Sequence, residues 1–210
     1  MLRLRFLEAN EYLLPRLLCS MVFIEVSGGK DSTLALLYMY DRFRKYRGNM
    51  RILYIRTPLS HPLNDGYIYH LGGKLGIPVI VLENSDVMKL SKDKVIEICR
   101  KGLCMWLFKK KPLTRFIREH KGVYVLGVRK FESRRRRRYE LRLVFDRWYR
   151  IYIYYPLLYM TNDERDQLLE SLRRKYGVGV NPCWLFKYNI NRSSGDCYPC
   201  LLYKIKNVVS

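Results

Sequence analysis

The sequence predicts an α/β protein: a mostly parallel, doubly wound sheet with helices on both faces, followed by a small cysteine-bearing C-terminal segment. Short β-branched apolar runs alternate with segments whose apolar residues repeat at helical spacing, the pattern of successive strand and helix units. Turns that hold glycines and charged residues directly follow the strands, and in parallel sheets such turns gather at one edge. We therefore expect a ligand site at the carboxyl ends of the strands.

The expected elements alternate from residue 21 to residue 126. In chain order they are strand 21–26, helix 31–46, strand 52–55, helix 64–75, strand 78–82, helices 86–100 and 112–120, and strand 123–126. Beyond residue 140 the pattern changes to tyrosine-rich apolar segments. Thr161 and Glu164 then form a capping box, which predicts a helix that runs to Tyr176 and stops at Gly177.

This 210-residue chain is strongly basic. It contains 40 Lys and Arg against 19 Asp and Glu, which gives a net charge of +21 at pH 7. Such an excess favours a polyanionic partner, since each neutralised phosphate releases condensed counterions. A basic surface that only aids solubility is the alternative. No apolar stretch approaches the ~20 residues of a membrane span, and Glu8, Glu11 and Pro15 interrupt any signal-peptide core. We expect a cytoplasmic protein that does not bind membranes.

The turn after the first strand reads Ser27-Gly28-Gly29-Lys30-Asp31-Ser32-Thr33 and opens the first long helix. Backbone N–H groups at a helix N-terminus gather around anions, helped by the positive end of the helix dipole. The glycines are adjacent and the lysine follows at once, so the segment does not fit GxxxxGK[ST]. We expect a phosphate group at this turn.

Residues 27–32 resemble the SGGxDS signature of the PP-loop ATP pyrophosphatase superfamily, whose members act at the α-phosphate of an adenine nucleotide. Later stretches resemble the phosphoadenylyl-sulfate reductase branch of that superfamily, in its order. They are Cys104-x4-Lys109-x2-Pro112-Leu113, Gly127-x-Arg129-x2-Glu132-Ser133-x2-Arg136, Tyr155-Pro156-Leu157, Asn181-Pro182 and Arg192-x2-Gly195-x-Cys197-x2-Cys200. The resemblance spans residues 21–200 and implies an adenine nucleotide alpha hydrolase-like fold. It divides the chain into an N-terminal extension (1–20), a nucleotide-binding domain (21–160) and a helix with a cysteine-bearing tail (161–210).

This resemblance implies roles for the residues that follow the strands. Lys30, Asp31 and Arg129 are the expected catalytic residues, with Asp31 either holding Mg²⁺ or capping the helix. Arg129 and Arg136 have the planar fork that suits a sulfate or phosphate. The expected nucleotide- and phosphate-binding set is Ser27, Gly28, Gly29, Lys30, Asp31, Ser32, Thr33, Thr57, Gly127, Arg129, Glu132, Ser133 and Arg136. The expected ligand is ATP or a (phospho)adenylyl sulfate.

The expected metal ligands are Cys104, Cys183, Cys197 and Cys200, for which a [4Fe-4S] cluster, structural zinc and no metal are all left open. The Cys197-x2-Cys200 spacing lets both sulfurs reach one ion. Iron-sulfur members of the branch carry two adjacent cysteines where this chain has Leu103-Cys104, so Cys183 would complete the set. With three ligands one iron would stay open, as in tRNA thiolases that use a similar loop.

Two basic segments exceed what one nucleotide pocket can use. They are Lys109, Lys110 and Lys111, and the run of five arginines Arg134, Arg135, Arg136, Arg137 and Arg138. We expect the surplus to bind the backbone of a nucleic acid, tRNA or DNA. The nearby aromatics, among them Trp148 and Tyr149, either stack on bases or fill the core.

The leading hypothesis is an enzyme of the reductase-like PP-loop family that acts at the α-phosphate during sulfur transfer to, or adenylation of, a nucleic acid. The first alternative is an adenylyl-sulfate or phosphoadenylyl-sulfate reductase that releases sulfite. Against it, the chain lacks the C-terminal Glu-Cys-Gly motif of thiol-dependent reductases. The second alternative is a nucleic-acid-binding module without turnover. The family also leads us to expect a homodimer and a sulfur donor or reductant protein as partners.

Overall fold

The computed structural model describes residues 6–9, 11–134 and 136–186, and the strands within these residues form one seven-stranded sheet in the order β1-β6-β7-β5-β2-β3-β4. The strands are β1 (Phe6–Glu8), β2 (Val22–Glu25), β3 (Met50–Ile55), β4 (Val79–Leu82), β5 (Val123–Leu126), β6 (Leu143–Asp146) and β7 (Ile151–Tyr154). The pairs β7–β5, β5–β2, β2–β3 and β3–β4 are parallel, whereas β6 and β1 add antiparallel pairs at one side. The predicted mostly parallel α/β fold is confirmed.

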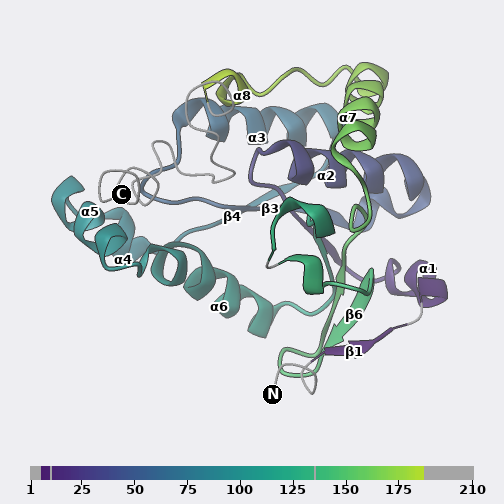
Figure 1. Ribbon diagram of the computed structural model, residues 1–210, viewed down its shortest axis with the longest axis horizontal. Helices are drawn as coiled ribbons and strands as arrows, with labels where there is room; N and C mark the ends of the chain where they lie inside the picture. Colours follow the sequence, from purple (N-terminus) through teal and green to yellow (C-terminus); the bar gives the residue numbers. More distant parts are fainter. Residues whose placement is uncertain (1–5, 10, 135, 187–210) are drawn as a thin grey trace.

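Helices cover both faces of this sheet. On one face lie α2 (Lys30–Arg42), α3 (Pro62–Leu75), α7 (Asn162–Tyr176) and α8 (Pro182–Phe186), and on the other lie α4 (Ser85–Met88), α5 (Lys92–Arg100) and α6 (Lys111–Glu119) (Figure 1). A short α1 (Leu14–Leu17) precedes β2, and a π-helical turn, η4 (Met105–Lys110), leads into α6. The described residues contain no helix with the length and apolar character that crossing a membrane requires.

The two largest hydrophobic cores lie on opposite faces of the sheet, because strand residues alternate between the faces. Val22 and Ile24 of β2 pack into the larger core with Leu36 of α2. Phe23 points to the opposite face, where its ring packs edge-on against Phe116 of α6 with centroids 5.1 Å apart. A sheet that buries both faces is the arrangement that its near-continuous apolar strands predict.

Three local predictions differ from the structure. The single helix expected over 86–100 is wrong, because Asn84 caps α4 through the Asp86 amide (3.3 Å) and a second helix starts after Ser91. Helix α2 ends at Arg42 and continues as a 3-10 segment, η3 (Arg44–Asn49), before β3. The tyrosine-rich stretch beyond 140 forms the antiparallel pair β6–β7, which alternation with helices gave no reason to expect.

Part of the expected N-terminal extension packs with the main domain. Strand β1 pairs with β6, and Leu14 and Leu18 are buried in the larger core. The divisions at residues 20 and 160 remain predictions, and residues 187–210 of the expected tail lie outside the described residues.

The far end of α7 is tied to α2 by Asp41, and this tie helps to fix where the start of α7 lies. The Asp41 carboxylate accepts a hydrogen bond from Lys175 Nζ at 2.6 Å and another from the Tyr176 hydroxyl. These bonds, led by the one from Lys175, lower the pKa of Asp41 to about 2. The predicted capping box at the other end of α7 is confirmed, with Thr161 and Glu164 bonded reciprocally.

We predict that Asp41→Asn lowers the free energy of unfolding at pH 7 by roughly 1 kcal/mol, as expected for a partly exposed charged contact. A carboxylate whose folded pKa lies below its unfolded value stabilises the fold above about pH 4 and loses that contribution as pH falls through about 2. Urea unfolding at pH 7 and pH 2 measures the difference, which should shrink at the lower pH. Glu119→Gln, which removes an exposed pair with Arg115, is the control. An Asp41→Asn effect that persists unchanged at pH 2 would contradict this account.

Candidate active site

The turns after β2 and β5 meet at the carboxyl edge of the sheet. These strands are parallel neighbours, so their carboxyl ends lie side by side. A Cβ added at Gly127, directly after β5, would lie 2.6 Å from the Asp31 carbonyl oxygen and 2.8 Å from Ser32 Cα. Only glycine allows this close approach of two backbones. Gly127 therefore holds the segment that carries Arg129 against the first turn of α2.

The loop of residues 27–32 is closed by its own serines. Ser32 Oγ donates to the Gly29 carbonyl at 3.1 Å and accepts from the Ser27 amide at 3.1 Å, while the two serine hydroxyls lie 3.1 Å apart. The cap of α2 is Gly29, which has no side chain to bond the amides of the first helical turn. Amides in that position are the usual ligands of a phosphate or sulfate.

Three side chains from distant parts of the chain donate hydrogen bonds to the backbone carbonyl groups of this loop. The Gly28 carbonyl accepts hydrogen bonds from Asn181 Nδ2 (2.8 Å) and Trp184 Nε1 (2.7 Å). Asn64 Nδ2 donates to the Ser27 carbonyl at 3.2 Å, and Asn64 Oδ1 accepts from Asn181 at 2.8 Å. Asn64 and Asn181 are 1% and 0% exposed. The loop conformation is thus fixed by buried, paired polar groups.

Arg129 and Asp31, two of the expected catalytic residues, form a buried ion pair. Arg129 is 3% exposed, and its Nε donates to Asp31 Oδ1 at 2.9 Å. Another guanidinium nitrogen donates to Asn162 Oδ1 at 2.9 Å, at the start of α7. Arg165 Nη1 approaches Asp31 Oδ1 at 3.4 Å. The Asp31 carboxylate is therefore engaged by two arginines.

Lys30, the third expected catalytic residue, contacts α7. Its Nζ lies 3.3 Å from Asp166 Oδ1, and Arg165 holds the same carboxylate through two bonds of 2.9 Å. Burial raises the pKa of Asp166, but the hydrogen bond and charge of Arg165 and the charge of Lys30 outweigh this, so its pKa is lowered. Burial lowers the pKa of Arg165, but Asp166 and Asp31 outweigh it, so its pKa is raised. Both groups are fully charged at neutral pH.

The remaining predicted nucleotide-binding residues lie on the same edge. Thr33 is buried in α2, and its amide donates to the Gly29 carbonyl at 2.9 Å. Thr57, directly beyond β3, is also buried, and its amide donates to Ser60 Oγ at 3.0 Å. After β5, Ser133 accepts the Arg136 amide on its carbonyl at 3.0 Å. Glu132 forms an ion pair with Arg136, so Arg136 is held by its own turn.

Much of the predicted basic surface is exposed. Arg134, Arg137, Lys110 and Lys111 are exposed, and Lys111 lies 3.7 Å from Asp86. Lys109 is half-buried in η4. Arg135 and the side chain of Arg138 lie outside the description. Of the aromatics, Trp148 is exposed, whereas Tyr154 is buried and Tyr149 and Tyr152 pack partly into the cores, so most of this group serves packing.

Two of the four predicted metal ligands are described. Cys104 packs partly buried beside Phe108 in a small core of α4, α5 and η4, and Cys183 is buried in α8, one residue before the loop-bracing Trp184. Cys197 and Cys200 lie outside the described residues. Among residues 6–9, 11–134 and 136–186, no group of three or more His, Cys, Asp or Glu is placed to hold a metal ion. The metal assignment therefore stays a prediction.

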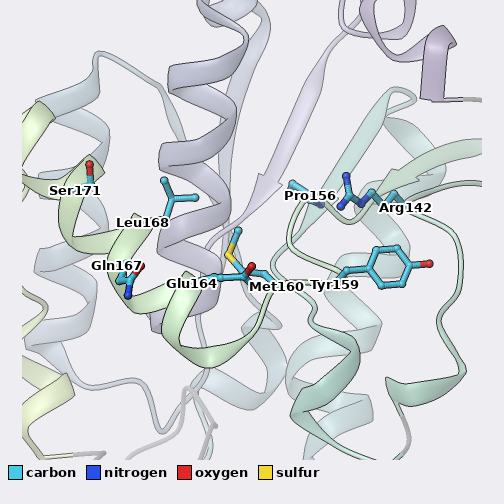
Figure 2. Close-up of a pocket in the computed structure, with 8 residues that line it drawn as sticks. All are labelled: Arg142, Pro156, Tyr159, Met160, Glu164, Gln167, Leu168 and Ser171. Carbon is cyan, nitrogen blue, oxygen red and sulfur yellow. The ribbon is translucent and has the colours of Figure 1, made fainter.

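A groove with a volume of about 620 Å³ lies on another side of α7. Figure 2 shows it between α7 and the turn that follows β7. Its lining residues are Arg142, Pro156, Tyr159, Met160, Glu164, Gln167, Leu168 and Ser171. None of these belongs to the loop of residues 27–32, so the lining of the groove shares no residue with the phosphate loop.

Sequence reasoning missed several residues of this site. Asn64, Arg165, Asp166 and Trp184 were not among the candidates, and Asn181 was noted only for its place in the family order. The capping box at Thr161 could have indicated that the first turn of α7 lies near the site edge. No local pattern reveals that Asn64 and Asn181 meet, since 117 residues separate them.

Comparison with known proteins bears on the family and the fold. The family model described as phosphoadenosine phosphosulfate reductase domain matches residues 21–178. The chain is similar to phosphoadenylyl-sulfate (PAPS) reductase from Candida auris in its phosphate complex, with a TM-score of 0.60 and 13% identity over 84% of this chain and 83% of that one. It is also similar to the U34-tRNA thiolase NcsA from Methanococcus maripaludis with its [4Fe-4S] cluster, with a TM-score of 0.52 and 15% identity over 96% and 81%. At such identities the structural matches show a shared fold. No curated protein sequence matches the chain.

We predict that Gly28→Ala destabilises the protein far more than Gly29→Ala. Gly28 has φ +79°, and an added Cβ would lie 2.0 Å from Asn64 Oδ1, whereas at Gly29 the nearest atom would be 3.4 Å away. Left-handed backbone strain and the clash together should cost roughly 2 kcal/mol or more, against about 1 kcal/mol or less for the cap position. Thermal unfolding of the two variants measures this difference. Equal losses would show that Gly28 is not constrained as described.

Proposed function

The chain belongs to the phosphoadenosine phosphosulfate reductase domain family, and from this premise we propose that it is an enzyme that binds ATP or an adenylyl sulfate at the loop of residues 27–32. Its chemistry takes place at the α-phosphate, in sulfur transfer to, or adenylation of, a nucleic acid. The observation that carries this proposal is the loop itself, whose glycine-capped helix start lies beside the buried ion pair of Arg129 and Asp31.

The loop provides two kinds of phosphate ligand. The first-turn amides of α2 offer donors that require no side-chain movement, and Lys30 brings a cation, held by Asp166, to the same place. Arg129 is held between Asp31 and Asn162, so its fork is oriented before the nucleotide arrives. Preorganised donors of this kind stabilise the charge that develops on a leaving pyrophosphate or sulfur group.

The proposed ATP reaction has two balanced steps. An acceptor oxygen of the nucleic acid attacks the α-phosphorus, the bond to the pyrophosphate breaks, and pyrophosphate leaves into the loop while the acceptor becomes adenylylated. In the second step the terminal sulfur of a donor persulfide attacks the acceptor carbon and displaces AMP, and a second thiol then cleaves the mixed disulfide, so that the sulfur stays on the acceptor and the donor leaves as a disulfide. Asp31 is the carboxylate of this loop that would hold Mg²⁺, which would supply positive charge to the phosphate group.

An iron-sulfur cluster or zinc is part of the proposal through Cys104, Cys183, Cys197 and Cys200. The described part of the chain contains the first two, Cys104 in the small core of α4, α5 and η4 and Cys183 buried in α8, and no complete donor set. A bound cluster would supply a site for sulfur or electron transfer. Anaerobic purification with a visible spectrum and elemental analysis separates the cases: iron with a broad band near ~400 nm indicates a thiolate-ligated cluster, and zinc alone a structural site.

We predict that Lys30→Ala weakens nucleotide binding by about 10- to 100-fold, the loss expected for one charge-assisted hydrogen bond. Isothermal titration with ATP, with adenosine 5′-phosphosulfate and with its 3′-phosphorylated form measures the affinities and shows which nucleotide is preferred. Lys94→Ala on α5, an exposed lysine remote from the loop, is the matched control. A parent protein that binds none of the three nucleotides would rule out the proposed function.

The reductase alternative remains a second candidate because the family model itself is named for that domain. In that reaction a thiolate attacks the sulfur of the sulfonucleotide, the nucleotide leaves, and a second thiol releases sulfite while a disulfide forms. Sulfite release from either sulfonucleotide with dithiol reductant, after anaerobic reconstitution, would establish it. ATP consumption that depends on added tRNA or DNA would instead support the leading proposal.

We predict that the exposed arginines of the 134–138 run bind nucleic-acid backbone. Replacing Arg134 and Arg137 with Gln should weaken tRNA binding and reduce the slope of log K against log salt by roughly 1 to 2. Arg115 and Arg118, exposed on α6, provide a control pair with the same change in charge. Equal effects from both pairs would show a diffuse basic surface.

The alternative of a nucleic-acid-binding module without turnover has its own test. It would be favoured if the parent protein consumes no ATP and if a Lys30→Ala, Asp31→Ala double variant binds tRNA as well as the parent does.

A further inference from the structure

One carboxylate of α7 touches two cations at the phosphate loop. Asp166 lies 3.3 Å from Lys30 Nζ through Oδ1, and Arg165 donates to Oδ1 and Oδ2 at 2.9 Å each. A tetrahedral anion at the loop would use the same two cations, since bidentate arginine and a lysine point charge are the usual ligands of phosphate and sulfate. In this structure Asp166 holds both.

The Arg165 side chain is held by two carboxylates, those of Asp166 and Asp31. Neighbouring residues on a helix point in different directions, yet the Arg165 guanidinium folds back to reach Asp166 while it also approaches Asp31. The Arg165 side chain is 14% exposed, whereas Asp166 is 46% exposed. The Arg165 guanidinium is therefore held inside the site. The Asp166 carboxylate that pairs with it lies at the solvent side, where a ligand can replace it.

The local charges leave room for an incoming anion. Asp31 is shared between the buried Arg129 and Arg165, whereas Asp166 contacts both Lys30 and Arg165. A phosphate or sulfate group offers three terminal oxygens to the same cations. Exchange of Asp166 for such a group keeps every cation paired, and it moves Asp166 into water, where a carboxylate is well solvated.

Resting on the proposed function, we propose that Arg165 is a ligand-binding residue for the phosphate or sulfate group of the nucleotide, and that Asp166 is an internal substitute for that group which must be displaced before the nucleotide binds. Asp166 then lowers the apparent affinity of the loop for every anionic ligand, because binding includes the breaking of its contacts with Lys30 and Arg165. A ligand without an anionic group at this position does not compete with Asp166. Asp166 thereby lowers the affinity for anionic nucleotides and leaves the affinity for a neutral nucleoside unchanged.

We predict that Asp166→Asn tightens binding and Arg165→Gln weakens it. The asparagine keeps the size of the side chain and removes the competing charge, so the Kd for ATP and for adenosine 5′-phosphosulfate should fall by about 3- to 30-fold, whereas Arg165→Gln should raise it by about 10-fold or more. Adenosine, which carries no anion, should bind the parent and Asp166→Asn equally. Glu170→Gln, one turn further along α7 and paired with Arg173 and Arg174, is the matched control.

The opposite signs separate this proposal from a purely structural role. If Asp166 only held α7 in place, Asp166→Asn would weaken ATP and adenosine binding together, and the proposal would be wrong. Unchanged or weaker ATP binding by Asp166→Asn, in a parent that binds ATP, would overturn the proposal while leaving the proposed function in place. A parent that binds no adenine nucleotide would remove the proposed function and this proposal with it.

Discussion

The Gly28 carbonyl is the point on which the site depends. Phosphate binding requires the amides of residues around the start of α2 to point outward, and a turn in that conformation directs its own carbonyls inward. An inward carbonyl without a partner would be costly. Asn181 and Trp184 supply two donors, and Gly28 must lack a side chain to let Asn64 and Asn181 approach. The loop is therefore assembled only when α3 and the segment leading into α8 have reached their places.

A second constraint couples the loop to the rest of the sheet edge. Gly127 brings the chain after β5 against the backbone of Asp31, and Arg129 then bonds Asp31 and Asn162 at once. Strand β5, helix α2 and helix α7 are thus joined through one buried guanidinium. Because both hydrogen bonds share that group, a change at either one alters the orientation of the other.

The fold class and the loop were accessible from sequence because both depend on local patterns. Apolar runs that alternate with helical segments predict a parallel sheet, and a parallel sheet binds its ligands at the carboxyl ends of its strands. Residues 27–32 and 127–129 follow strands that end at this edge. What escaped prediction depends on long-range contacts. Asn64, Asn181 and Trp184 act through hydrogen bonds that span over a hundred residues, and the β6–β7 pair extends a sheet whose other strands alternate with helices. Arg165 and Asp166 look in the sequence like ordinary charges on an exposed helix.

The positive charge of the chain divides into two kinds with different physical uses. Lys30, Arg129 and Arg165 are each held by a specific carboxylate, so their positions are set and they discriminate by geometry. Arg134 and Arg137 are exposed, Arg137 within a short 3-10 helix (Arg136–Arg138), where water screens their charge and many geometries are equivalent. Fixed cations suit a small anion of defined shape, whereas exposed ones suit a polymer that is bound through its charge density. An enzyme that activates a nucleotide for transfer to a nucleic acid would need both kinds of cation, and here the segment after β5 carries the buried Arg129 and the exposed Arg134 and Arg137 within nine residues of one another.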